Sequence, residues 1–131
     1  MRKIEAKTLN AIDPNNSIKK DWSFGNMAVY FSSDKKVCSI HLHGNLICRL
    51  WPDEIAFYDA GWKSNTTKSR INSIANFFGV PGVYQHKFDW WIDKKTPWVG
   101  SVHYKLPTNQ YGALGRFIDY RPLLGVALNL P

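Results

Sequence analysis

The sequence predicts an α+β fold in which an antiparallel sheet of five or six strands packs on one central helix, with N- and C-terminal extensions. Turn residues separate four strand-like segments between residues 27 and 59. Residues 66–78 then repeat apolar side chains at helical spacing, and residues 84–106 return to the alternation of strands. Together these three observations favour a sheet whose strands are interrupted by one helix.

At 131 residues the chain has the length of a single domain, and its 44% hydrophobic and 15% aromatic content favours a packed core over disorder. We divide the domain 1–131 into an N-terminal arm (1–26), a core of sheet and helix (27–106) and a packed C-terminal tail (107–131). The arm alternates charged and turn-forming residues with isolated apolar ones, and we expect it to lie on the core. In the tail we expect one short helix or turn and an extended segment.

The first four strands are expected at 27–32, 37–43, 46–51 and 54–59, as an antiparallel meander. A three-residue loop at 43–45 would collect six apolar side chains on one face of the central hairpin. Its opposed pairs are Leu42 with Leu46, Ile40 with Cys48, and Cys38 with Leu50. The opposite face then carries Ser39, His41, Ile47, Arg49 and Trp51. That face is either exposed to solvent or covered by the arm.

The helix is expected over 66–78, where apolar residues recur with the spacing of one buried face. Ser64, Asn65 and Thr66 are competent N-caps before it, and Gly79 is a natural stop after it. Further along, the apolar side chains alternate from Tyr84 to Ile92, so we expect one amphipathic strand there. The inward residues of this strand would be Tyr84, His86, Phe88, Trp90 and Ile92. Residues 98–106 continue the alternation and are expected to be its hairpin partner.

The start of this helix is a candidate anion site. The chain carries a formal charge of +7 and has a pI near 9.5, which favours an acidic partner, nucleic acid first. A helix N-terminus adds unpaired N–H groups and the positive end of the helix dipole. The predicted phosphate site comprises Lys63, Ser64, Asn65, Thr66, Thr67, Lys68 and Arg70. The alternative is that the basic balance only aids solubility.

A second group of residues is predicted to contact a base or a protein partner. Its members are Trp62, Lys87, Trp91 and Arg49. Alternation places Trp91 on the face opposite Trp90, beside Lys87, where its ring could stack on a base or anchor a protein interface. The arm or the tail covering this ring is an equal alternative.

The sequence offers no signature of catalysis, metal binding or secretion. Cys38 and Cys48 lack zinc-type spacing and are expected to be reduced core residues. His41 and His43 stand two residues apart, which is weak spacing for a metal site, and we expect no metal and no cofactor. No nucleophile elbow or P-loop is present, so we expect no enzyme. Without a signal peptide or an apolar run long enough for a membrane span, we expect a cytoplasmic protein.

Three stretches of the chain are similar to a family of small proteins encoded by tailed bacteriophages. They are the hairpin around His43-Gly44-Asn45, the Gly61-Trp62 turn with its Thr66-Thr67-Lys68 helix start, and the strand from Val83 to Trp91. The resemblance covers residues 37–92 and leaves the arm and the tail outside. It implies a viral source and a host-cytoplasm setting, and no particular chemistry.

We therefore expect a phage-encoded accessory protein that binds nucleic acid through phosphates and catalyses no reaction. The alternative is a host-takeover or anti-defence protein that blocks a host protein through exposed aromatic and cationic residues.

Overall fold

The computed structural model describes residues 2–92 and 95–106. The helices are α1 (Lys3–Ile12) and α2 (Asn65–Phe78). The strands are β1 (Trp22–Phe24), β2 (Met27–Phe31), β3 (Cys38–Leu42), β4 (Asn45–Trp51), β5 (Glu54–Tyr58), β6 (Val83–His86), β7 (Asp89–Ile92), β8 (Thr96–Pro97) and β9 (Ser101–Lys105). One sheet has six strands in the order β1-β2-β3-β4-β5-β9, and a second has three in the order β6-β7-β8.

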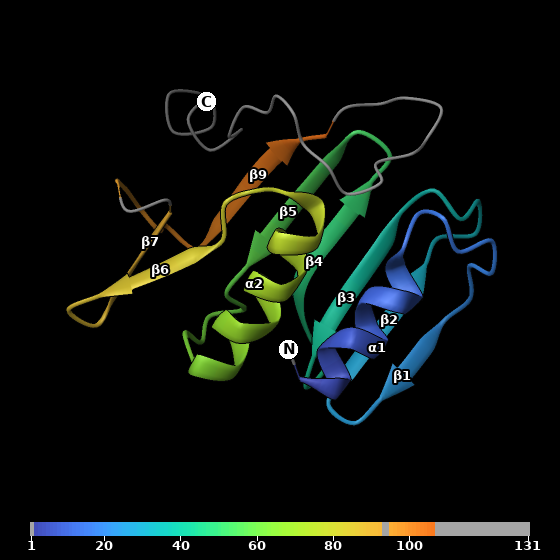
Figure 1. Ribbon diagram of the computed structural model, residues 1–131, viewed down its shortest axis with the longest axis horizontal. Coiled ribbons are helices and arrows are strands. Elements are labelled where there is room, and N and C mark those ends of the chain that lie inside the picture. The colour runs from blue at the N-terminus through green and yellow to red at the C-terminus, as the bar shows by residue number, and fades with distance from the viewer. Residues whose placement is uncertain (1, 93–94, 107–131) are drawn as a thin grey trace.

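All strand pairs are antiparallel, which confirms the predicted α+β fold and its antiparallel sheet. The strands β2 to β5 begin and end within one residue of the predicted meander. Figure 1 shows α1 and α2 on the same face of the larger sheet, while β6 and β7 extend beyond its edge. The larger sheet therefore has one face covered by helices and one that the helices leave open.

The central hairpin follows the predicted register in part. Ile40 opposes Cys48 and Cys38 opposes Leu50, as predicted. The prediction that Leu42 opposes Leu46 is wrong, because the loop has two residues and Leu42 pairs with Asn45. His43 and Gly44 both have positive φ (52° and 81°), as a tight two-residue hairpin turn requires. The turn is one residue shorter than predicted, and a bulge in β4 supplies the extra residue that restores the predicted pairing of Cys48 with Ile40. This bulge leaves Ile47 without a partner in β3. Ile47 is consequently buried, and its predicted place on the opposite face is also wrong.

The helix α2 confirms the predicted helix, which begins one residue earlier than expected and ends at Phe78 as predicted. The Ser64 side chain caps its N-terminus, and Gly79 ends it with φ of 70° in the left-handed region. The helix α1 lies within the segment expected as an arm, so a second helix joins the single one that was predicted. Two of its four buried residues, Glu5 and Thr8, are polar, which leaves the apolar repeat that signals a helix incomplete.

The single strand predicted at 84–92 is wrong: the structure has two strands, β6 and β7, with a tight turn between them. Lys87 and Phe88 form this turn with φ of 51° and 73°, so the alternation ends there. Phe88 is 93% exposed at the tip, where the prediction had placed it in the core. The predicted hairpin partner is also corrected, because β9 pairs with β5 in the larger sheet and β7 pairs with β6 and β8.

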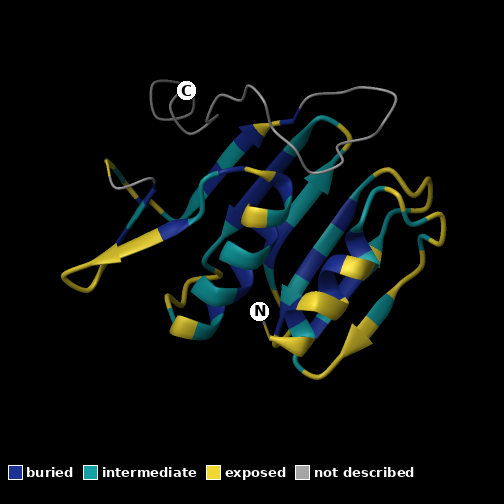
Figure 2. Cartoon of the chain, in the orientation of Figure 1, coloured by how far each residue is buried: buried dark blue, intermediate teal, exposed yellow. Residues whose placement is uncertain are grey.

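The core lies between the helices and the sheet. Figure 2 shows the buried residues on the surfaces that the helices and the sheet turn toward each other. Its fully buried large side chains include Met27, Ile40, Phe57, Ile71, Ile74, Phe78 and Tyr104. Cys38 and Cys48 are buried free thiols on β3 and β4, as expected for core cysteines. The predicted C-terminal tail, 107–131, lies outside the described residues.

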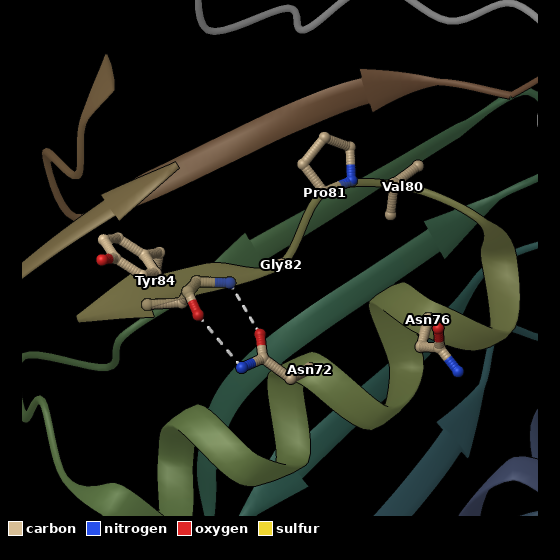
Figure 3. Close-up of a pocket in the computed structure, with 7 residues that line it drawn as sticks. Asn72, Asn76, Val80, Pro81, Gly82 and Tyr84 are labelled. Atoms are coloured by element: carbon tan, nitrogen blue, oxygen red, sulfur yellow. Dashed lines mark hydrogen bonds between the residues drawn. The ribbon is translucent and has the colours of Figure 1, made fainter. Parts of the chain in front are cut away.

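The side-chain amide of Asn72 joins α2 to β6. It donates to the carbonyl of Val83 over 3.1 Å and accepts from the N–H of Val83 over 2.6 Å (Figure 3). One side chain thereby satisfies both the N–H and the carbonyl of Val83. A Cβ on the neighbouring Gly82 would collide with this amide, so glycine is needed for the close approach of helix and strand.

Candidate nucleic-acid interface

At the start of α2, the polar residues of the predicted phosphate site serve first to cap the helix. The Ser64 hydroxyl accepts from the N–H of Thr67 over 3.0 Å and also hydrogen-bonds the Thr67 hydroxyl. Lys63 and Asn65 are exposed, whereas Thr66 is half-buried and Thr67 is buried. No acidic residue lies in the first turn, so the positive end of the helix dipole is not neutralised there.

Arg70 points away from this surface and is buried beneath α1. Its Nη1 donates to Oε2 of Glu5 over 2.8 Å, and the Ser69 hydroxyl donates to the same oxygen. Burial by itself would raise the pKa of Glu5, but these hydrogen bonds outweigh it and hold the pKa below its ordinary value of 4.5. Arg70 is therefore a structural residue and takes no part in an anion surface.

Lys68 remains available, although not fully free. Its Nζ donates to Oε1 of Gln85 on β6 over 2.7 Å, and this amide does not neutralise the charge of the lysine. Of the three cations predicted at the helix start, Lys63 and Lys68 therefore keep charges that an anion could meet.

The four predicted partner-contact residues do not form one site. Trp62 is 73% exposed in the loop before α2, and Lys87 is exposed in the turn between β6 and β7. Trp91 is half-buried opposite Tyr84, with its Nε1 buried and without a hydrogen-bond partner among the described residues. Arg49 lies on β4, on the face of the larger sheet that the helices leave open.

That open face is the most distinctive surface of the described chain. Alternation along the strands places on it residues that are mostly aromatic, cationic or small. They are Ala28, Tyr30, Ser39, His41, Leu46, Arg49, Trp51, Glu54, Ala56, Tyr58, Ser101, His103 and Lys105, of which Ala56 is buried among its neighbours. Among residues 2–92 and 95–106, no helix covers this side of the sheet (Figure 1).

The rings of this face form a connected set around Arg49. The guanidinium lies 6.0 Å from the centre of the Trp51 ring, within the range of a cation–π contact. Trp51 in turn stacks against His103 at 6.4 Å, and Tyr58 meets the edge of the same histidine at 6.1 Å. These contacts hold the rings in place before any ligand arrives.

A depression of about 480 Å³ opens beside this set, between Tyr30 and Trp51. Tyr30 is 48% exposed and contacts His41 through a ring edge at 5.2 Å. Ser39 lies between the two rings and gives the depression a low floor, because its side chain is small.

Among the described residues, some charged side chains at the open face are paired with a neighbour of opposite charge, and Arg49 is not. Glu54 pairs with Nδ1 of His103 over 3.1 Å, and Asp53 pairs with Lys105 over 3.5 Å. Arg49 has no ion pair within the described part of the chain, so its charge remains available to a ligand. Burial raises the pKa of the Tyr58 hydroxyl above its ordinary value of 10.0, so this group adds no negative charge to the face.

Sequence reasoning placed Arg49 and Trp51 on one face but missed Tyr30, Tyr58 and His103. A signal for these three was present, because each occupies the outward phase of alternation in its own strand. For His103 this signal could be used only after β9 had been paired with β5. Taken together, a polarised aromatic surface and an unpaired guanidinium can stack flat rings and receive an anionic group.

These observations define a small basic α+β protein with a helix-covered face and an open aromatic face. The family model described as Kyanoviridae Gp96 protein matches residues 1–109, and the chain belongs to this family of bacteriophage proteins. The match confirms the phage family expected from the sequence and also includes α1, which the expected resemblance left outside. Neither the curated proteins nor the solved structures gave a match. No helix in the described residues has the length and apolarity to cross a membrane.

Proposed function

We propose that this phage protein is an accessory factor in the host cytoplasm that binds nucleic acid through its phosphates and catalyses no reaction. The observation that carries the proposal is Arg49, a cation without a carboxylate partner among the described residues, set within aromatic rings on an open sheet face. A net charge of +7 supplies the long-range attraction to a polyanion.

The wider distribution of charge supports the same partner. Within residues 2–92 and 95–106, Arg70 and Lys105 are the lysine and arginine side chains that pair with a carboxylate. The other described cations therefore keep their charge for an external anion. Phosphate contacts of this kind release counterions, so binding must weaken as salt rises.

The first test measures affinity for labelled oligonucleotides by fluorescence anisotropy over a range of salt concentrations. We expect log affinity to fall linearly with log salt, and Arg49→Ala to flatten the slope by about one unit. Lys3→Ala is the matched control, because it removes the same charge from an exposed position on α1, away from the open face. Affinity that does not depend on salt, or equal effects of the two variants, would contradict this assignment.

A second candidate function is the blocking of a host protein, and the tip of the β6–β7 hairpin favours it. Phe88 is 93% exposed at the end of a hairpin that extends beyond the larger sheet (Figures 1 and 2). An aromatic side chain in such a position is a typical interface anchor.

For this candidate we expect Phe88→Ser to abolish capture of one host protein from nuclease-treated lysate, while binding to oligonucleotides stays at the wild-type level. Tyr84→Ser, at a less exposed ring of the same hairpin, serves as the comparison. If the set of captured proteins is the same for wild type and Phe88→Ser, the hairpin tip is not an interface.

A further inference from the structure

We infer that the open face selects single-stranded nucleic acid, with a base stacked in the depression between Tyr30 and Trp51 and a neighbouring phosphate held by Arg49. This inference rests on the proposed function and names the class of nucleic acid. It starts from the sheet register, which fixes how these three side chains lie relative to one another.

Tyr30 pairs with Ser39, and Ser39 pairs with Arg49, so the three residues form one row across β2, β3 and β4. Neighbouring strands lie about 4.8 Å apart, which places the backbones of Tyr30 and Arg49 about 10 Å from each other. Trp51 follows two residues after Arg49 and points to the same side of the sheet. A ring, a small residue and a cation beside a second ring thus lie across three adjacent strands.

The dimensions of the depression suit a nucleobase. Its volume of about 480 Å³ falls in the range of small-molecule sites, and its floor is made by Ser39 instead of a large side chain. Tyr30 offers 48% of its surface, enough for a planar ligand to lie on the ring. Base stacking on such a ring tolerates any sequence, because every base has a flat face.

The rings and the cation are already ordered. Arg49 and His103 hold Trp51 from two directions, at 6.0 Å and 6.4 Å between centres. Binding therefore costs little additional side-chain entropy, since the platform is preorganised. Lys35 and Lys36 are exposed in the loop between β2 and β3, next to the depression, and can meet further phosphates. Asp34 in the same loop is engaged by the Ser32 hydroxyl and the N–H of Lys36.

A duplex does not fit this arrangement as well as a single strand. The bases of a duplex are stacked on one another and present only their edges in the grooves. No element of the described chain projects from the open face to enter a groove, because β2 to β5 and β9 form a continuous sheet there. An unpaired base, in contrast, can lie flat on Tyr30 while its phosphate faces Arg49.

The test compares a labelled single strand of about 12 nucleotides with the blunt duplex of the same sequence, over the same series of salt concentrations. We expect the single strand to bind more tightly. Tyr30→Ala and Trp51→Ala should each weaken single-strand binding by about 5- to 150-fold and leave the salt slope unchanged. The effect on the duplex should be small for both variants.

Two control variants separate stacking from folding and from aromatic content. Tyr30→Phe keeps the ring and should bind the single strand as the wild type does. Phe24→Ala removes a 45% exposed ring from β1, in the same phase as the buried Met27 and so not on the open face, and should also leave the affinity unchanged. Circular dichroism of all four variants checks that the sheet is intact, and Tyr30 is exposed enough for truncation without unfolding.

The outcomes distinguish this inference from the proposed function. Salt-dependent binding that survives both ring truncations, or a preference for the duplex, overturns the single-strand inference and leaves nucleic-acid binding in place. Absence of binding to either oligonucleotide overturns both. Loss of single-strand binding in Tyr30→Ala and Trp51→Ala, with Tyr30→Phe and Phe24→Ala unaffected, supports the stacked site.

Discussion

Glu5→Ala is expected to lower the free energy of unfolding by about 3–5 kcal/mol, because it leaves the guanidinium of Arg70 buried without its counter-charge. Both side chains are 5% exposed, and the Nη1 to Oε2 distance is 2.8 Å. Nε of Arg70 is already buried without a hydrogen-bond partner among the described residues, so the carboxylate is its main compensation. Chemical denaturation of wild type and variant measures the difference.

Two further variants show whether the cost comes from the unpaired charge. Replacing both partners, with Glu5→Leu and Arg70→Met, should recover most of the lost stability, because no buried charge then remains. Asp89→Ala removes a carboxylate from an exposed position and should change stability by less than about 0.5 kcal/mol. A similarly small effect of Glu5→Ala would show that α1 does not cover Arg70 in solution.

The same ion pair predicts a pH dependence of stability. The pKa of Glu5 is lower in the folded state than its ordinary value of 4.5, so the unfolded state binds more protons in that range. The stabilisation is therefore complete above pH 4.5 and is lost as the pH falls through the lower, folded-state pKa. Glu5→Gln should remove this part of the acid sensitivity, which unfolding curves between pH 6 and pH 3 would reveal (about 1.5 units either side of the ordinary value).

Cys38 is expected to react with a thiol reagent about 10³-fold more slowly in the native protein than in the unfolded chain, and the reaction of Cys48 is expected to be slowed as well. Burial raises the pKa of Cys38 from 9.0 to about 12, and burial also raises the pKa of Cys48. Only the thiolate reacts, and three pKa units reduce its fraction by about 10³ at neutral pH. Burial of both sulfurs slows access further.

The measurement follows the release of a chromophore from an aromatic disulfide reagent, with and without denaturant. Ser17→Cys places a thiol at an exposed position and should react at the rate of a free thiol in the native protein. Rapid labelling of Cys38 and Cys48 under native conditions would show that the face between the sheet and the helices opens easily. It would also weaken the placement of both residues in the core.

Local patterns determined the parts of the fold that depend on neighbours in sequence. The helix from Asn65 to Phe78 follows from its cap at Ser64, its stop at Gly79 and the apolar spacing between them. The meander from β2 to β5 follows from alternation and short turns. The outward position of Arg49 and Trp51 follows from the same alternation, so part of the candidate interface could be predicted.

Turn conformation decided the places where alternation was misleading. The pattern from Tyr84 to Ile92 fits one strand, yet positive φ at Lys87 and Phe88 divides it into two. The bulge at Ile47 likewise moves an expected outward side chain into the core. Lys87, Phe88 and Ile47 are not glycine, so the turn and the bulge have no local signature in the sequence.

The sequence by itself determined the fold class, the central helix, the basic charge and one strand of the candidate interface. Only the tertiary structure decided that Arg70 forms an ion pair with Glu5 of α1 and is not free to bind an anion, because Glu5 lies 65 residues away in sequence. It likewise decided that β9 joins β5 and brings His103 beside Trp51. Hydrophobic periodicity reports which side of an element is buried, whereas partners distant in sequence are chosen by packing and charge compensation across the whole domain.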